Sequence, residues 1–415
     1  MSTAILGDRQ LDLRLDQIPE SVLHATFQRA EDTHGVSLCR LDVGEPAFRA
    51  PLAAQTALIE SLRAGKTGYT TAGGSAELRE VLADKLRTAN DVDTTAQRVL
   101  FTPGSSFAIA AIMLAVCEPG DEILLPEVFW PIYAQAAAIA GVAVRTYPLA
   151  RGYQVDPDRL AGAATERTRL VIVNSPANPT GAVCSAQTQA AIASWARYRG
   201  IWLIGDEAYE HFVYDGDHVA LASAERDVDP DERRVFSVHT FSKGYGMTGY
   251  RAGYAAAPND KAASLLRRVA EGTIIGPSTP VQHAAAAALS DLDAPRLAAE
   301  HVRTVRDAAL TGAVAAGLLD QLPPAGWYAM VDISSTGCGS AEFCERLLAE
   351  HQVLVAPGSA FVAPGAPDPL SVRVAFCGDR DATVEGVRRL VLLATALREK
   401  VPSHANLVTA TFGSD

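Results

Sequence analysis

The sequence predicts an α/β protein in which a mainly parallel sheet is joined to a smaller α+β unit. From residue 99 onwards, short apolar stretches alternate with alanine-rich helical stretches. Near-continuous apolar strands of this kind are typical of a parallel sheet covered by helices on both faces. Polar or glycine-rich motifs follow several of them, and α/β proteins bind ligands at such strand ends. Seven strands are expected, at residues 99–102, 122–125, 143–147, 170–174, 202–205, 235–238 and 253–256.

Further elements flank this alternation. Residues 20–30 form an amphipathic segment, and residues 41–46 are expected to form a short strand that enters a turn. Ser75 is a predicted helix N-cap. Helices are predicted at residues 53–64, 76–88, 107–116, 132–140, 186–199, 281–289, 296–318 and 341–351, with a last helix that ends near residue 399. Three further apolar segments lie at residues 327–332, 353–358 and 371–376.

The chain length predicts two domains. A chain of 415 residues exceeds the size of one ordinary hydrophobic core. Beyond Pro280 the pattern changes from strand–helix alternation to α+β. We expect an N-terminal arm and part of the small domain at residues 1–45, a large ligand-binding domain at 46–290, the C-terminal small domain at 291–400 and a tail at 401–415.

Composition and charge argue against several classes of function. The net charge of -12 and the pI of about 5.3 disfavour nucleic acid or an anionic membrane as the main partner. The sequence shows neither a signal-peptide core nor an apolar stretch of membrane-spanning length, so a cytoplasmic location is expected. Six scattered cysteines without a Cys-x-x-Cys pair predict reduced thiols rather than disulfides or a metal site.

The stretch around Lys243 is the most informative. Lysine occurs only five times, and arginine supplies nearly all the other positive charge. A lysine in such a chain suggests chemistry that arginine cannot perform, because a lysine amine can lose its proton and form a Schiff base with a carbonyl. Lys243 follows the predicted strand at residues 235–238, and glycines at 244, 246, 249 and 253 permit close approach to a ligand. Taken alone, this stretch also fits a glycine-rich loop with a solvated lysine.

Residues at other strand ends point to a bound cationic ring. Asp206 ends the strand predicted at residues 202–205, and a buried carboxylate is costly unless a cation partners it. A protonated pyridine nitrogen would be such a partner, and Tyr209 could hydrogen-bond a phenolic oxygen on the same ring. Trp130 could stack on the ring, although it equally fits a core position. Two X-Pro bonds force an irregular turn, which can direct the Asn178 amide into the site. The alternative is an ordinary turn without a binding role.

Two further stretches predict an anion-binding cup. Ser105 and Ser106 open a predicted helix, where amide hydrogens and hydroxyls can bind an anion. A serine in this place is often only a helix cap. Thr240 and Arg251 add a hydroxyl and a planar cationic fork that suit a phosphate group.

Together these motifs resemble the class I/II aminotransferase family of fold-type I pyridoxal 5'-phosphate (PLP) enzymes. The resemblance covers about residues 20–400 and implies a fold-type I PLP-dependent transferase, with a mainly parallel seven-stranded sheet in the large domain. The motifs follow the family order, namely Gly44-Glu45-Pro46, Gly68-Tyr69, residues 103–106, Asn178-Pro179-Thr180-Gly181, Asp206-Glu207-Ala208-Tyr209, Ser242-Lys243, Gly249-Tyr250-Arg251 and Val372-Arg373-Val374.

The resemblance implies roles for the matching residues. Lys243 would form the Schiff base with PLP, and Asp206 would pair with the ring nitrogen. Tyr209 would act with them and, together with Asn178, hold the ring oxygen. The other cofactor contacts would come from Ser105, Ser106, Trp130, Thr240 and Arg251, and from Tyr69 of the neighbouring subunit in a homodimer with active sites at the interface. The substrate site would comprise Gly44, Trp130, Asn178 and Arg373, with Arg373 clamping the α-carboxylate.

Two positions depart from the usual family pattern. Thr240 stands where serine is common, which preserves the hydroxyl. Ser105 and Ser106 replace a more usual small-residue pair, and the bulky Phe107 follows them. Backbone contacts of this loop are therefore expected to matter more than its side chains.

The implied reaction is transfer of an amino group from an L-amino acid to a 2-oxo acid, with Lys243 as general base. A lyase, cyclase or oxidase on the same fold remains the alternative, since these reactions begin from the same carbanion. Residues 273–278 offer no second cation of the kind that dicarboxylate-specific relatives use. With Trp327 and Tyr328 elsewhere, this favours a neutral or aromatic substrate. A DNA-binding regulator built on this fold would need a basic domain ahead of Gly44, where only about 40 residues stand.

Overall fold

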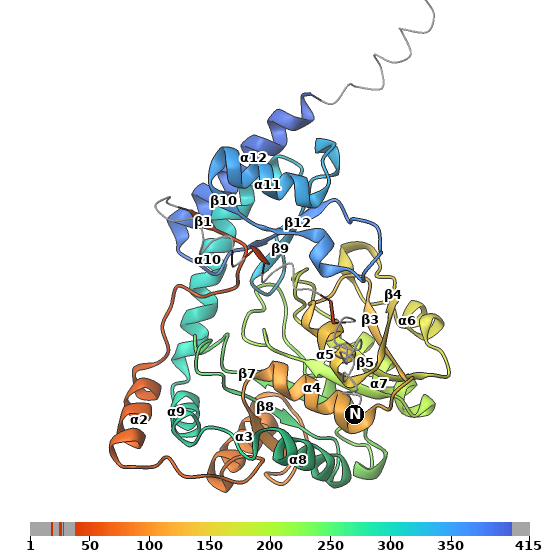
Figure 1. The fold of residues 1–415 in the computed structure, drawn as a ribbon, viewed down its shortest axis with the longest axis vertical. Coiled ribbons are helices and arrows are strands. Elements are labelled where there is room, and N and C mark those ends of the chain that lie inside the picture. Colours follow the sequence, from red (N-terminus) through yellow and green to blue (C-terminus); the bar gives the residue numbers. More distant parts are fainter. Residues whose placement is uncertain (1–17, 20–24, 27, 29–37, 401–415) are drawn as a thin grey trace, which may run out of the picture.

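The computed structural model describes residues 18–19, 25–26, 28 and 38–400. The predicted tail at 401–415 and most of the amphipathic segment at 20–30 lie outside these residues. Figure 1 shows a large sheet with its covering helices below two small sheets, and α10 (Asp293–Ala315) running between the two parts. The predicted α/β fold class is confirmed.

The large sheet has seven strands in the order β2-β8-β7-β6-β5-β3-β4. β8 runs antiparallel to its neighbours β2 and β7, and the other pairs are parallel. Each strand lies within two residues of its expected place. The strands are β2 (Val99–Thr102), β3 (Glu122–Pro126), β4 (Ala143–Tyr147), β5 (Thr168–Asn174), β6 (Trp202–Asp206), β7 (Val235–Thr240) and β8 (Gly253–Ala256).

Helices cover both faces of this sheet because its central strands are apolar on both sides. Leu170 and Ile172 of β5 pack with α4, α5 and α8 on one face, and Val171 and Val173 pack with α6 and α7 on the other. A third cluster joins α2, α3 and α9 to β2 and β8. These helices are α2 (Leu52–Arg63), α3 (Ala76–Ala89), α4 (Ser105–Val116), α5 (Ile132–Ala140), α6 (Pro157–Ala163), α7 (Ala186–Arg199), α8 (Asp260–Ile274) and α9 (Thr279–Leu289).

Most helix positions agree with the sequence expectations, including the N-cap of α3, where Ser75 accepts a hydrogen bond from Leu78 N. Two helices, α6 and α8, were not expected. The buried residues of α8, among them Ala262, Leu266 and Ala270, recur every four positions, which is the spacing of an amphipathic helix. That period, and the capping Asn259, could have revealed α8.

The two small sheets form the second part of the molecule with α10, α11 (Ser340–His351) and α12 (Arg380–Arg398). One pairs β1 (Cys39–Arg40) with β10 (Val353–Leu354) in parallel. The other has the antiparallel order β11-β12-β9, comprising β11 (Ala356–Pro357), β12 (Ser371–Ala375) and β9 (Tyr328–Asp332).

The strand expected at residues 41–46 is wrong, because the strand ends at Arg40. The segment that follows turns its carbonyl oxygens towards cations of the cavity described below. Asp42 O accepts a hydrogen bond of 2.5 Å from Arg373, and Gly44 O accepts one of 3.3 Å from Lys243. Backbone acceptors used in this way are not available to a neighbouring strand.

All six cysteines are free thiols. Within the described residues, no group of three or more His, Cys, Asp or Glu side chains is placed to hold a metal ion. The helices of the described part of the chain include none with the length and apolar character needed to cross a membrane.

Candidate active site

A cavity of about 380 Å³ opens at the carboxyl edge of the large sheet. Parallel pairing brings the ends of neighbouring strands together there, so that Asn174 of β5 lies opposite Asp206 of β6. All but two of the expected site residues line this cavity. They are Gly44, Ser105, Ser106, Trp130, Asn178, Asp206, Tyr209, Thr240, Lys243 and Arg251.

Asp206 is a buried carboxylate, only 2% exposed, at the end of β6. Its Oδ2 accepts a hydrogen bond of 2.5 Å from the Tyr133 hydroxyl, and its Oδ1 accepts one of 3.2 Å from Ala208 N. Burial raises the pKa of Asp206, although the Tyr133 hydrogen bond opposes this shift. No cation lies within ion-pair distance of Asp206 among the residues that the structure describes. The carboxylate can therefore receive a cationic ligand.

Lys243 reaches the cavity from the turn that follows β7. Its Nζ donates a hydrogen bond of 3.3 Å to Gly44 O. Gly44 must be glycine for this close approach, because a Cβ there would collide with the Tyr328 hydroxyl. The amine thus lies at the cavity wall without an ion-pair partner in the described part of the chain.

The amino terminus of α4 forms one end of the cavity. Gly104, with a φ of 83°, caps this helix without a side-chain hydrogen bond, so the first amide groups of α4 are available to an anion. A Cβ on Gly104 would lie 2.5 Å from Arg251 Nη2, so glycine also makes room for the guanidinium. Arg251 Nη2 lies 3.5 Å from Ser106 Oγ. A phosphate group fits this combination of a helix terminus, hydroxyls and arginine.

Arg373 lies directly behind the cavity wall. Its Nη1 donates a hydrogen bond of 3.1 Å to Asn178 Oδ1, and its guanidinium is 4.1 Å from the centre of the Tyr328 ring. Asn174 Oδ1 in turn accepts a hydrogen bond of 2.7 Å from Asn178 N, which fixes the irregular turn. Arg373 is 3% exposed, and its Nε has no hydrogen-bond partner among the described residues. An incoming carboxylate would supply the missing acceptor.

Aromatic side chains complete the wall. The Tyr209 hydroxyl donates a hydrogen bond of 3.3 Å to the Tyr328 hydroxyl, and burial raises the pKa of Tyr209 well above its usual range. Trp130 lies edge to face with Tyr133, with 5.5 Å between the ring centres. Trp130 is thus part of the cavity wall rather than of the closed core, and it can stack on a planar ligand.

The two expected site residues that do not line the cavity are Arg373, which lies behind its wall, and Tyr69, which is 89% exposed. Sequence reasoning in turn missed Tyr133 and Asn174, and it singled out Tyr328 without placing it at the cavity. Tyr133 comes three residues after Trp130, so the two side chains share one face of a helical turn. That spacing was the available signal for Tyr133. For Asn174, the available sequence signal was its position at the end of a predicted strand.

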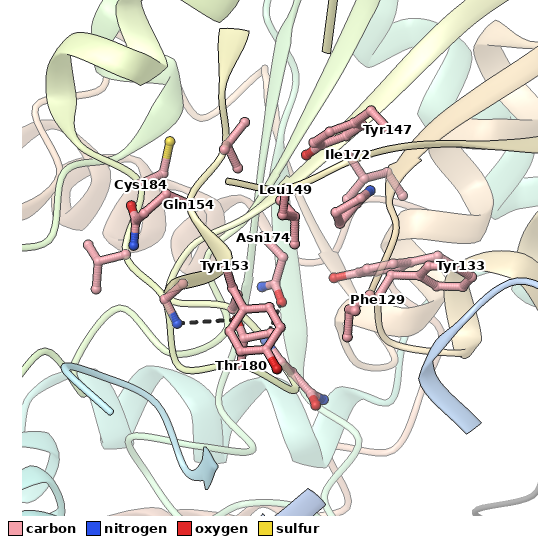
Figure 2. A pocket seen from close by; sticks show the side chains of 17 residues that line it. Phe129, Tyr133, Tyr147, Leu149, Tyr153, Gln154, Ile172, Asn174, Thr180 and Cys184 are labelled. Atoms are coloured by element: carbon pink, nitrogen blue, oxygen red, sulfur yellow. Dashed lines mark hydrogen bonds between the residues drawn. The ribbon is translucent and has the colours of Figure 1, made fainter. Parts of the chain in front are cut away.

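A much smaller pocket of about 30 Å³ lies on the other side of this wall and shares Tyr133, Asn174 and Asn178 with the main cavity. Figure 2 shows Tyr133 on one side of this pocket, and Gln154 and Cys184 on the other. Among the described residues that line it, none is a lysine or an arginine. Its lining therefore lacks the cations that distinguish the main cavity.

The sequence pattern of the family Aminotransferase class I and II matches residues 37–390. The chain belongs to this family. It is 35% identical to the aspartate/prephenate aminotransferase of Thermus thermophilus over 86% of this chain and 93% of the relative. It is 32% identical to the arginine–pyruvate transaminase of Pseudomonas aeruginosa over 88% of this chain and 91% of that protein.

Solved structures of aminotransferases show the same fold. The aspartate aminotransferase of Thermus thermophilus with maleate is 31% identical, with a TM-score of 0.86 over 93% of this chain and all of that one. The N-succinyldiaminopimelate aminotransferase of Mycobacterium tuberculosis is 32% identical, with a TM-score of 0.84 over 92% of this chain and all of that one.

This aminotransferase depends on pyridoxal phosphate and acts on an amino acid and a 2-oxo acid. The cavity fits the cofactor on its own chemistry. Asp206 is a buried carboxylate without a cation, and the amino terminus of α4 with Arg251 forms a place for an anion. The matches to named aminotransferases do not favour a lyase, cyclase or oxidase.

Proposed function

We propose that Lys243 holds the cofactor covalently and moves the substrate proton, in a site that takes neutral or aromatic L-amino acids. The observation that carries this proposal is the set of cations at the cavity. Among the described lining residues, only Lys243 and Arg251 are lysine or arginine, and Arg373 lies directly behind Asn178.

Each of the other cavity residues would bind a different part of the cofactor. Asp206 would hold the protonated ring nitrogen, and its burial would make that charge pair strong. Asn178 and Tyr209 would hold the ring oxygen, and Trp130 would stack on the ring. The phosphate contacts would come from the α4 amide groups, Ser105, Ser106, Thr240 and Arg251.

The proton chemistry then follows from the side chains. Bound pyridoxal phosphate supplies an electron sink for the pair that remains when the substrate Cα loses its proton. Lys243 Nζ would accept that proton, because the amine lies in the wall of the cavity and has no carboxylate partner among the described residues. Arg373 would fix the substrate carboxylate, which orients the Cα–H bond towards Lys243. Gly44 would leave room for this carboxylate beside Tyr328.

The same set of cations supports the substrate class. Lys243 and Arg251 are assigned to the cofactor and Arg373 to the α-carboxylate. This leaves no lysine or arginine among the described lining residues for a second carboxylate. Glu45 also lines the cavity, and its charge would repel such a group. The aromatic rings of Trp130 and Tyr328 offer an apolar surface instead.

A homodimer would complete the site. Three exposed apolar residues of α2, namely Leu52, Ile59 and Leu62, recur at helical spacing. Tyr69 and Ile275 are also exposed, and the segments that carry them touch, since a Cβ on Gly276 would lie 2.6 Å from Thr70 O. Apolar patches of this kind mark protein interfaces. Tyr69 would then reach the cofactor site of the partner. Sedimentation would test the dimer, and weaker cofactor binding by Tyr69→Phe would test the contact.

The domain division would follow the two cores. Residues 1–45 would form the N-terminal arm and part of the small domain, residues 46–290 the large domain, residues 291–400 the rest of the small domain and residues 401–415 the tail. Leu41 packs in one cluster with residues of α10 and α12, which supports placing the N-terminal segment in the small domain.

Substituting Lys243 tests the central role. Lys243→Ala should lower turnover at least about 100-fold and remove the visible absorbance of lysine-bound cofactor. Lys261→Ala is the matched control, because Lys261 is an exposed lysine at the start of α8. A Lys243→Ala protein with normal turnover would overturn the assignment.

A panel of amino acids tests the substrate class. Each is mixed with the cofactor-loaded enzyme without an acceptor, and the visible spectrum of the cofactor is followed. We expect phenylalanine, tyrosine and leucine to react faster than aspartate and glutamate. Faster reaction with aspartate would reject the proposed class but not the aminotransferase activity.

A further inference from the structure

The amine of Lys243 faces an aromatic surface. Lys243 Nζ lies 4.6 Å from the ring centre of Trp327 and 5.6 Å from that of Tyr209. Its amine donates a hydrogen bond to Gly44 O, and no acidic side chain is within ion-pair distance of it in the described residues. After the Gly44 carbonyl, the Trp327 ring can compensate the charge of the amine, and it is the nearer of these two rings. The negative face of an indole ring attracts a cation at this distance.

Trp327 does not line the substrate cavity, so it is not one of the aromatic residues that could select the substrate. It is fully buried behind Lys243, at 0% exposure. Phe48, Tyr209 and Phe212 hold its ring by edge contacts, with 6.1, 5.8 and 5.1 Å between the ring centres. The orientation of the ring is thus fixed by packing.

The indole N–H of Trp327 has no hydrogen-bond partner in the described part of the chain. A buried donor without a partner is unfavourable, and a phenylalanine would fill this aromatic cluster without that cost. What tryptophan adds is a larger ring with a stronger attraction for cations. The neighbouring Tyr328 shows a similar arrangement, because Arg373 lies over its ring.

We propose that Trp327 is a positioning residue for Lys243, whose ring holds the protonated amine at the cavity wall between steps of the reaction. This inference rests on the proposed role of Lys243. Without the ring, the freed amine would be less well oriented when it must return to the reacting carbon. Turnover should then fall, while the substrate contacts made by Arg373 remain intact.

Titration of Lys243 tests the proposal without using activity. The full chain is stripped of cofactor, and its five lysines are labelled by reductive methylation with carbon-13 and titrated by NMR. The Lys243 signal is the one that Lys243→Arg removes. Trp327→Leu should increase the acid dissociation constant of Lys243 between twofold and thirtyfold, because the protonated form loses its partner. Trp327→Phe should give a smaller increase.

Phe212→Leu is the matched control, because Phe212 is equally buried and touches Trp327, and no contact joins it to the Lys243 amine. In the cofactor-loaded enzyme, Trp327→Leu should lower kcat about twofold to thirtyfold with KM unchanged, and Phe212→Leu should alter kcat less. If the Trp327→Leu protein does not fold, the titration of Lys243 in the Trp327→Phe protein tests the proposal instead. An unchanged Lys243 titration in the folded Trp327 variants, or an equal change in Phe212→Leu, would overturn the proposal. Failure of the Lys243 assignment would instead appear as an active Lys243→Ala protein.

Discussion

Asp206 and Glu207 are consecutive carboxylates, each 2% exposed, in opposite surroundings. Asp206 faces the cavity, and its side-chain partner is the neutral hydroxyl of Tyr133. Glu207 faces away from it. Its Oε2 lies 3.3 Å from His218 Nε2, and its Oε1 accepts hydrogen bonds from Leu221 N and Ser237 Oγ at 3.1 and 3.3 Å. Glu207 has a histidine within ion-pair distance, whereas Asp206 has hydrogen-bond donors but no cationic partner among the described residues.

The region around Glu207 continues as a network of buried polar groups. His239 is fully buried on β7, with its Nε2 2.8 Å from Ser237 Oγ and its Nδ1 3.1 Å from Glu210 Oε1. Lys85 Nζ donates to Glu210 at 2.6 Å. Burial alone would raise the pKa of Glu210, but Lys85 and His239 hold it well below its usual range. Buried charges that pair with one another, as Glu210 and Lys85 do, maintain the fold. The buried carboxylate of Asp206 has no such partner among the described residues and is available to a ligand.

The largest effect should come from neutralising the unpaired carboxylate. Asp206→Asn should lower kcat about 100- to 1000-fold, because the electrostatic partner of the cofactor ring is lost. Glu207→Gln should stay within about tenfold of the parent enzyme, since its partners lie on the far side of the strand. Steady-state kinetics at saturating cofactor would measure both. Similar losses of kcat in the two variants would show that the two carboxylates do not differ in their importance for catalysis.

Substitutions in the buried network around Glu210 should instead change the free energy of unfolding. Lys85→Met should cost about 3 kcal/mol of unfolding free energy, because it leaves Glu210 buried without its principal cation. Asn90 and His239 would still contact Glu210, which limits the loss. Arg388→Met is the control. It breaks a surface ion pair with Glu385, for which we expect a much smaller loss because both groups are exposed to solvent. Urea unfolding followed by circular dichroism would compare them, and equal losses would contradict the network's role.

The fold and much of the cavity were accessible from sequence for a physical reason. Apolar strands, helix caps and strand-end motifs are local patterns, and parallel pairing then brings Asn174, Asp206 and Val238 to one edge. The buried network was not accessible, because Lys85 and Glu210 are 125 positions apart. Nothing local to either residue predicts the pairing.

Side-chain direction was the second limit. Trp327 and Tyr328 stood out as aromatic residues, yet only Tyr328 lines the cavity. Their sequence positions could not show that Trp327 packs behind Lys243. The strand expected at residues 41–46 failed similarly, since its carbonyl oxygens accept hydrogen bonds from the distant Arg373 and Lys243.

A smaller effect should appear in the cofactor-free protein. There Asp206→Asn should raise the unfolding free energy by about 1 to 2 kcal/mol. The reason is that burial raises the folded pKa of Asp206, so its ionisation at neutral pH weakens the fold. The same substitution should therefore stabilise the empty protein and impair the loaded enzyme. Urea unfolding at pH 7 without cofactor would measure the gain. A loss of stability would show that Asp206 is already satisfied without a ligand.

The smallest effect concerns pH. Because the folded pKa of Glu210 is lowered from 4.5, its ionised form stabilises the fold above that pH, and this contribution is lost as the pH falls towards the lowered value. Glu210→Gln should be less stable than the parent at pH 7, and the difference should shrink below pH 4.5 by at most about 1.4 kcal/mol per pH unit. Unfolding of both cofactor-free proteins between pH 7 and pH 3.5 would measure it. Parallel curves would mean that Glu210 keeps an ordinary pKa, and that the buried pairing with Lys85 does not control the protonation of this carboxylate.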